Sequence, residues 1–207
     1  MQQNTIIIGY SGHSYVAIDI LQKNNFLVEG YCDSQKKEFN PFNIEYLGSE
    51  ADLPSEQFLQ KNFFIGIGSN NIRKDIFSFL EKEKANTINV IHPFSSLAND
   101  VNLAKGIMVA AGVVINPQVK IGNAVICNTN CTIEHECVID NFVHLAPGVI
   151  VCGNVSIGES TFVGAGAILK QGISIGKNCT IGAGAVVLND VQDNITIIGN
   201  PGKILIK

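Results

Sequence analysis

The sequence predicts a chain in two parts, a small α/β domain over residues 1–88 and an all-β parallel solenoid over residues 89–207. Two patterns predict this division. The first third alternates short apolar runs with helical patterns, as expected for βαβ units that build a parallel sheet. The remainder repeats every six residues, a period that fits neither an α-helix, at about 3.6, nor a flat amphipathic strand, at about 2.

The six-residue repeat runs without an insertion from Leu103 to Val187. A small or β-branched residue usually stands two positions before each aliphatic one, and glycine often follows it. This pattern is typical of a hexapeptide solenoid, in which three short strands and three turns make one triangular coil. Burial of one aliphatic side chain contributes ~1.5–3 kcal/mol, so a stack of them can hold the coils together. The aliphatic series is Leu103, Val109, Ile115, Ile121, Cys127, Ile133, Ile139, Leu145, Val151, Ile157, Val163, Leu169, Ile175, Ile181 and Val187.

The N-terminal part has the pattern strand, glycine-containing turn, helix, strand. Residues 5–9 form an apolar run typical of a buried parallel strand, and a helical pattern and a second strand follow. A later strand is expected at residues 62–68, and a helix at 72–83 that Ser69 and the two asparagines after it can cap. With right-handed crossovers these elements give a small, truncated Rossmann-like sheet.

The turn after the first strand contains Ser11, Gly12 and His13. Backbone N–H groups at a helix N-terminus can bind a phosphate. Asp33, at the end of the second strand, is placed to bond a ribose or a base. The full dinucleotide fingerprint is absent, because Ser11 occupies the position of its second glycine. The turn therefore favours a mononucleotide over NAD, or it is a plain βα turn in which His13 only caps the helix.

Charge and local composition argue against a nucleic-acid partner, secretion and insertion in a membrane. The net charge is −4 and no basic stripe is present, which argues against nucleic acid as the main partner. The first residues lack the positive n-region of a signal peptide, and residues 5–9 are too short to span a membrane. We expect a cytoplasmic protein. Its six cysteines lack zinc-site spacing and are expected to be free, mostly buried thiols.

Polar residues are sparse in the repeat, and the segment around His135 and His144 stands out. Both histidines are expected to face away from the solenoid interior. Gly153 stacks one coil above His135 and leaves space beside its imidazole. A histidine held by a neighbouring carboxylate, here Glu134 or Glu136, suits general-base catalysis near neutral pH. The alternative is a histidine on a solvated turn.

The two histidines lie half a coil apart, so they can converge only across a corner or with another protomer's surface. A zinc site of the type found in solenoid carbonic anhydrases needs three histidines. Only two occur in the repeat, so no metal is expected.

Several motifs together resemble one family. They are the turn at residues 9–13, Asp33, the run at 65–74, the junction at 91–93 and, most specifically, the segment at 133–144. Over almost the whole chain these look like the NeuD/PglD-type sugar acyltransferases, and within them like the nucleotide-sugar 4-amino-sugar N-acetyltransferases. The resemblance implies a left-handed parallel β-helix, a homotrimer with active sites between solenoids, and acetyl-CoA in the groove between neighbours. It also implies a role in surface-polysaccharide or glycoprotein sugar biosynthesis.

The resemblance also implies residue roles. His135 matches the general base and Glu136 the carboxylate that orients it. One departure is Ser34, where a second acid often follows the residue matched by Asp33. The acetyl-CoA side would comprise His144, Gly153, Gly164, Ala165, Gly182, Ala183 and Lys203. The nucleotide-sugar side would comprise Ser11, Gly12, His13, Asp33, Gly68 and Asn70.

The expected activity is acetyl-CoA-dependent N-acetylation of the C4 amine of a UDP-, dTDP- or GDP-linked 4-amino-4,6-dideoxy sugar, by direct transfer with a histidine base. Three alternatives come from other classes. The first is O-acetylation of sialic acid or another sugar hydroxyl. The second is a nucleotidyltransferase, whose glycine-rich loop is missing at the start of the chain. The third is a non-catalytic solenoid scaffold.

Overall fold

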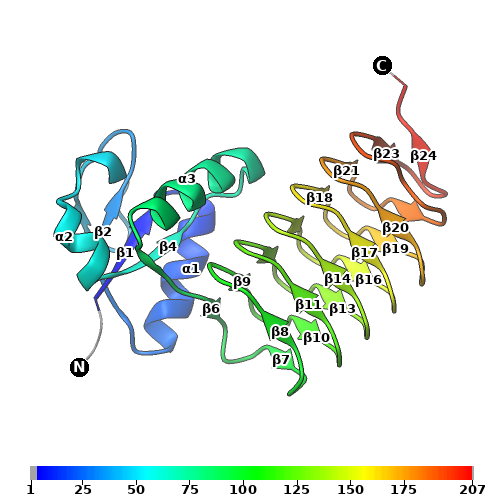
Figure 1. Cartoon of the computed structure of the whole chain (residues 1–207), viewed down its shortest axis with the longest axis horizontal. Coiled ribbons are helices and arrows are strands. Elements are labelled where there is room, and N and C mark those ends of the chain that lie inside the picture. The colour runs from blue at the N-terminus through cyan, green and yellow to red at the C-terminus, as the bar shows by residue number, and fades with distance from the viewer. Residues whose placement is uncertain (1–3, 207) are drawn as a thin grey trace.

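The computed structural model describes residues 4–206, which form an α/β domain joined to a long triangular solenoid. Figure 1 shows the helices gathered around the sheet of the N-terminal domain, and the coils of the solenoid extending away from them to the C-terminus. None of the helices within this described range is long and apolar enough to cross a bilayer.

The N-terminal domain is a five-stranded parallel sheet with helices on both faces. The strand order is β3-β2-β1-β4-β5. The predicted strands, the first helix and the helix after the last glycine turn are present. The two-residue strands and the elements between β2 and β4 were not predicted. The elements are β1 (Asn4–Ile8), α1 (Gly12–Lys23), β2 (Leu27–Cys32), β3 (Glu45–Tyr46), the 3₁₀ helix η1 (Glu50–Asp52), α2 (Ser55–Gln60), β4 (Asn62–Ile65), α3 (Asn70–Lys82) and β5 (Asn86–Thr87).

Two apolar layers hold this domain together and continue onto the solenoid. On one face, Ile7 of β1 and the buried side of α1 pack with Met108 and Ile126. On the other face, Ile6 and Ile8 pack with α2, α3 and the solenoid residue Phe142. Successive strand residues point to opposite faces, so β1 contributes to both layers. The outer surface of the solenoid is therefore part of the N-terminal domain's own core.

The solenoid consists of three sheets, one on each side of a triangular prism, and they are parallel except for the last pair, β23 and β24. The N-terminal domain packs on the first of these three sheets, which is here called the docking sheet. It contains β6 (Val90–Ile91), β9 (Met108–Val109), β12 (Ile126–Cys127), β15 (His144–Leu145), β18 (Phe162–Val163), β21 (Thr180–Ile181), β23 (Thr196–Ile198) and β24 (Lys203–Ile204). The second contains β7 (Ser96–Leu97), β10 (Val114–Ile115), β13 (Thr132–Ile133), β16 (Ile150–Val151), β19 (Ile168–Leu169) and β22 (Val186–Val187). The third contains β8 (Asn102–Leu103), β11 (Lys120–Ile121), β14 (Val138–Ile139), β17 (Ser156–Ile157) and β20 (Ser174–Ile175).

The predicted inward series is the solenoid core. From Val109 onward its aliphatic members are at most 3% exposed, and neighbouring coils pair at a spacing of 18 residues, as between Ile121 and Ile139. The solenoid is longer than the regular repeat. It begins at β6, and the last coil is shorter, because Thr180 of β21 pairs with Thr196 of β23. The strict six-residue series from Leu103 to Val187 therefore stops short of both ends, which lie within the residues 89–207 predicted for the solenoid domain.

Glycine has two separate uses in the corners. Gly166, with φ +67°, occupies a left-handed position that recurs every sixth residue, and residues such as Asn154 and Ser160 fill the same position with φ near 60°. The glycines that follow the aliphatic residue are different. A Cβ on Gly164 would lie 2.6 Å from the backbone nitrogen of Ala183 in the next coil. Those glycines allow close stacking of coils rather than a special φ.

Candidate active site

His135 and Glu136 form an exposed acid–base pair at a corner of the solenoid. They connect β13 to β14, and their side chains are 52% and 56% exposed. His135 Nδ1 lies 3.0 Å from Glu136 Oε2. Because a carboxylate only accepts hydrogen bonds, Nδ1 carries the proton in this pair and Nε2 keeps its lone pair. The other flanking acid, Glu134, is held instead by the side-chain amide of Asn116 at 2.8 Å.

Gly153 lies directly beside this imidazole, as the 18-residue stacking predicted. A Cβ at position 153 would be 2.5 Å from His135 Cε1 and 2.6 Å from Nε2. Only glycine at position 153 allows the His135 ring to occupy this place. Within residues 4–206 the N–H of Gly153 has no hydrogen-bond acceptor, so it is free to donate to a ligand beside the ring.

His144 lies elsewhere, under the N-terminal domain. It faces away from the solenoid interior as predicted, but it belongs to the docking sheet and is only 5% exposed. Its Nδ1 lies 3.2 Å from the carbonyl of Gly68, and its ring meets His13 and Phe162 edge-on, each at a centroid distance of 5.1 Å. Burial, with the charge of Arg73, lowers the pKa of His144 to about 3. Its assignment to acetyl-CoA remains a prediction.

The glycine turn of the N-terminal domain opens into a cavity of about 410 Å³ at the carboxyl ends of β1 and β2. Asp33 Oδ2 accepts the backbone N–H of Tyr10 at 3.0 Å, and its other oxygen pairs with Lys37 Nζ at 2.9 Å. Burial raises the pKa of Asp33, but the hydrogen bonds from Lys37 and Tyr10 outweigh it and lower that pKa overall. The cavity is lined by Ile8, Gly9, Tyr10, Ser11, Asp33, Ser34, Lys37, Ser49, Glu50, Ile67, Ile72 and Ile76.

The structure therefore groups Ser11 and Asp33 in one cavity, with Gly12 beside them at the start of α1. His13 is one residue further on and points elsewhere, toward Gly68. A Cβ on Gly68 would lie 2.4 Å from the His13 ring. Burial lowers the pKa of His13, and the charge of Arg73 lowers it further. His13, Gly68 and His144 thus form a second group at the domain junction.

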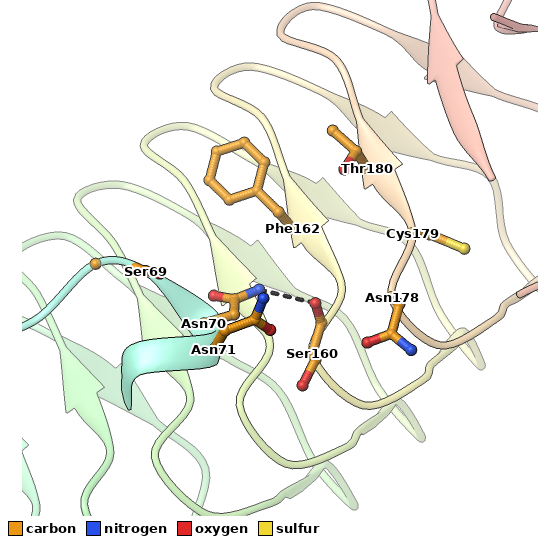
Figure 2. Close-up of a pocket in the computed structure, with 9 residues that line it drawn as sticks. Ser69, Asn70, Asn71, Ser160, Phe162, Asn178, Cys179 and Thr180 are labelled. Carbon is orange, nitrogen blue, oxygen red and sulfur yellow. Dashed lines mark hydrogen bonds between the residues drawn. The ribbon is translucent and has the colours of Figure 1, made fainter. Parts of the chain in front are cut away.

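Asn70 belongs to this junction, and both ends of its amide are occupied. Its Nδ2 donates to the carbonyl of Ser160 at 2.9 Å, and its Oδ1 accepts from Arg73. Figure 2 shows this bond at the wall of a second cavity of about 550 Å³, between the start of α3 and strands β18 and β21. Ser69 is the N-cap of α3 but makes no capping hydrogen bond through its side chain. The cavity is lined by Gly68, Ser69, Asn70, Asn71, Ser160, Phe162, Asn178, Cys179 and Thr180.

Arg73 is the junction residue that the sequence interpretation missed. It is 1% exposed and donates to the carbonyls of Ala124 at 2.7 Å and Phe142 at 2.8 Å on the solenoid. It also donates to the carbonyls of Ile67 and Gly68 within its own domain. Burial lowers the pKa of Arg73 to about 10. A signal was available, because Arg73 is in helical register with the apolar residues at positions 76, 77 and 80.

The remaining residues predicted for acetyl-CoA lie far along the solenoid. Gly164 and Ala165 follow β18, and Gly182 and Ala183 follow β21, so the two pairs occupy the same corner in successive coils. Lys203 is exposed on β24, which pairs antiparallel with β23. The two glycine–alanine pairs lie along one edge of the prism, and the role of all five residues in binding remains a prediction.

The cysteines do not form a chemical centre. All six thiols are free, and all except half-buried Cys152 are buried. Within residues 4–206 there is no cluster of three or more His, Cys, Asp or Glu side chains arranged to hold a metal ion.

Comparisons with known proteins agree with this architecture. Residues 4–80 match the family model for the PglD N-terminal domain, and residues 154–189 match the model for six repeats of the bacterial transferase hexapeptide. A histidine-to-asparagine mutant of perosamine N-acetyltransferase from Caulobacter crescentus, solved with CoA and GDP-perosamine, is 31% identical. It has a TM-score of 0.94, covering 99% of this chain and 97% of that chain.

Two further relatives are similar. The acetyltransferase domain of PglB from Neisseria gonorrhoeae FA1090 is 29% identical with a TM-score of 0.91, covering 98% of this chain and 100% of that chain. GDP-perosamine N-acetyltransferase from Escherichia coli O157:H7 is 30% identical over 135 residues, which is 65% of this chain and 60% of that protein. The match thus spans less than two thirds of that curated relative.

Proposed function

Because the chain belongs to the NeuD/PglD-type family of hexapeptide-repeat sugar acyltransferases, built on a left-handed parallel β-helix, we propose that it is an acetyl-CoA-dependent N-acetyltransferase. The acceptor is the C4 amine of a nucleotide-linked 4-amino-4,6-dideoxy sugar. The observation that carries this proposal is the exposed His135–Glu136 pair with the free N–H of Gly153 beside it. The relatives named for GDP-perosamine N-acetylation support the acceptor class.

His135 acts as the general base in direct transfer. Its Nδ1–H donates to Glu136, which fixes the ring and leaves Nε2 to take a proton from the attacking amine. The amine nitrogen forms a bond to the thioester carbonyl carbon, and the carbon–sulfur bond then breaks. The proton held on the imidazole passes to the leaving thiolate, which restores the neutral base. Glu136 stabilises the imidazolium in between.

Gly153 supplies the oxyanion donor. This N–H has no acceptor within residues 4–206 and belongs to the residue that packs against the imidazole, so a carbonyl that accepts it is held close to the base. Much of the acceleration comes from holding the two substrates side by side. This mechanism needs no nucleophilic cysteine.

The active site is completed by a second copy of the chain, as a homotrimer. His135 stands at the corner between the second and third sheets, which is opposite the docking sheet with its N-terminal domain. One protomer therefore presents its base on one side and its nucleotide cavity on another. Outward apolar side chains on the solenoid, Val138 at 45% exposure and Ile150 at 40%, favour contact between copies.

The substrates also indicate a place in the cell. Nucleotide-linked sugars and acetyl-CoA are made in the cytoplasm, so we place the enzyme there, in the biosynthesis of sugars for surface polysaccharides or glycoproteins.

A thiol-release assay tests the proposal. The full chain is incubated with acetyl-CoA and UDP-, dTDP- or GDP-linked 4-amino-4,6-dideoxy sugars, and with matched sugars that carry a hydroxyl at C4. Release of free thiol with at least one amine acceptor, and an acetamide product by mass spectrometry, is the expected result. Turnover only with hydroxyl acceptors would identify an O-acetyltransferase. No release of thiol with any acceptor would favour a non-catalytic scaffold.

A further inference from the structure

The 410 Å³ cavity at the glycine turn has an apolar wall and a polar wall. Ile67, in the turn that follows β4, and Ile72 and Ile76 of α3 line one part of it. Ser49 and Glu50, from the start of η1, line another. Aliphatic side chains pack well against the face of a planar ring, and polar groups at the rim can then form hydrogen bonds with the edge of that ring. This lining suits a planar nucleobase whose hydrogen-bonding edge points toward η1.

Three charged groups line the cavity, and two of them are already paired. Asp33 and Lys37 form an ion pair at 2.9 Å, and Asp33 also accepts the N–H of Tyr10. Glu50 has no Lys, Arg or His within salt-bridge distance anywhere in residues 4–206. Its only side-chain hydrogen bond there is a long one, 3.5 Å from the Ser49 hydroxyl. The cavity thus contains one carboxylate with unused acceptor capacity.

The carboxylate of Glu50 also acts on the protein interior. Burial, with the negative charges of Glu50 and Asp52, raises the pKa of the neighbouring Cys32 thiol to about 12. Glu50 itself is half-buried. An acceptor in this position discriminates more strongly between ligand edges than one in open water, because a mismatched group there loses its hydration.

The hydrogen-bonding edges of the bases differ in what they offer a carboxylate. An ionised carboxylate has two acceptor oxygens and no donor. Guanine presents two adjacent donors, N1–H and N2–H, which match the two oxygens. Uracil and thymine present a single N–H between two carbonyl oxygens, which the carboxylate would repel. Adenine and cytosine place an acceptor next to their donor.

We propose that Glu50 selects guanine, so that the nucleotide part of the acceptor substrate is a guanosine diphosphate. This inference rests on the proposed function and adds the base to it. The side chain accepts both guanine donors, the base packs on Ile67, Ile72 and Ile76, and the ribose faces Asp33.

Calorimetric titration of the full chain with GDP, UDP and dTDP, without acetyl-CoA, tests the assignment. GDP is expected to bind at least ~10-fold more tightly than the other two. Glu50→Gln is expected to weaken GDP binding by ~10- to 100-fold and to change UDP and dTDP binding by less than ~3-fold, because two charge-assisted hydrogen bonds are lost only for guanine. Glu56→Gln is the matched control, since Glu56 is exposed on α2 outside the cavity, and all three affinities should stay unchanged.

Two outcomes overturn the assignment while leaving the proposed function intact. One is tighter binding of UDP or dTDP than of GDP, with thiol release on the corresponding amino sugar. The other is an equal loss for all three nucleotides in Glu50→Gln, which would place the carboxylate on the ribose or near the phosphates. If no nucleotide binds and no nucleotide-linked amino sugar releases thiol, the proposed function fails and the assignment fails with it.

Discussion

The corner around His135 and the junction around Arg73 show two ways of placing a functional group. At the corner, the neighbours of His135 are Glu136, next in sequence, and Gly153, one coil later. At the junction, Arg73 reaches Phe142 and Asn70 reaches Ser160, across 69 and 90 residues of chain. A periodic scaffold converts sequence spacing into spatial distance, whereas packing between two domains follows no spacing at all.

The largest effect is expected at the corner. His135→Ala should lower kcat by ~10²–10⁴ with little change in the KM for acetyl-CoA, because the proposed base is lost while the residues proposed to bind acetyl-CoA are unchanged. Initial rates of thiol release measure both constants. The side chain is half exposed, so the melting temperature should stay at the wild-type value. Near-wild-type turnover would show that His135 is not the general base.

The corresponding test at the junction is Arg73→Met. It should lower the free energy of unfolding by ~3–5 kcal/mol, since each buried carbonyl left without a donor costs roughly 1–3 kcal/mol. The carbonyls affected include those of Ala124 and Phe142 on the solenoid. Urea denaturation followed by circular dichroism measures the loss.

The neighbouring residue provides the control for that experiment. Lys74 also bridges the two domains, through Glu159, but its side chain is 45% exposed. Lys74→Met should cost less than ~1 kcal/mol, as exposed ion pairs do. Equal losses in the two variants would mean that the buried guanidinium does not join the domains.

A smaller effect on activity is expected from Gly153→Ala. The new Cβ would stand 2.5 Å from His135 Cε1, so the ring must leave its place, and kcat should fall ~10- to 100-fold. Gly148→Ala is a useful control, because its Cβ would meet nothing closer than 3.9 Å although φ is +69°. That variant should lose ~1–2 kcal/mol of stability through backbone strain and keep its kcat. The reverse pattern would contradict the stacking argument.

The junction should also impose a dependence of stability on pH. The pKa of His144 is lowered from 6.5 to about 3, so between these values the unfolded chain binds more protons than the folded one. Stability is therefore complete above pH 6.5 and decreases as the pH falls, by at most ~1.4 kcal/mol per pH unit from this residue. Urea unfolding at pH 7, 6 and 5 measures the slope, and His144→Phe should reduce it. An unchanged slope in that variant would exclude His144 as its source.

Much of the solenoid could be predicted from sequence. The inward series, the coil length and the position of Gly153 beside His135 follow from the six-residue period, because each side chain in a stacked coil has a fixed neighbour 18 residues away. In the N-terminal domain the apolar runs predicted β1, β2 and β4, but not η1 or the short β3 and β5. Short elements contain too few residues to show a period.

The sequence by itself determined the two-part fold, the family and the pairing of His135 with a neighbouring carboxylate. Only the tertiary structure decided how the parts meet. It buried His144 under Gly68, placed the guanidinium of Arg73 between the two domains, and left Glu50 at the glycine-turn cavity without an ion-pair partner in residues 4–206. The physical reason is that regular stacking has one solution for a given period. Docking of two irregular surfaces depends on every side chain at the contact, and no local pattern in the chain contains that information.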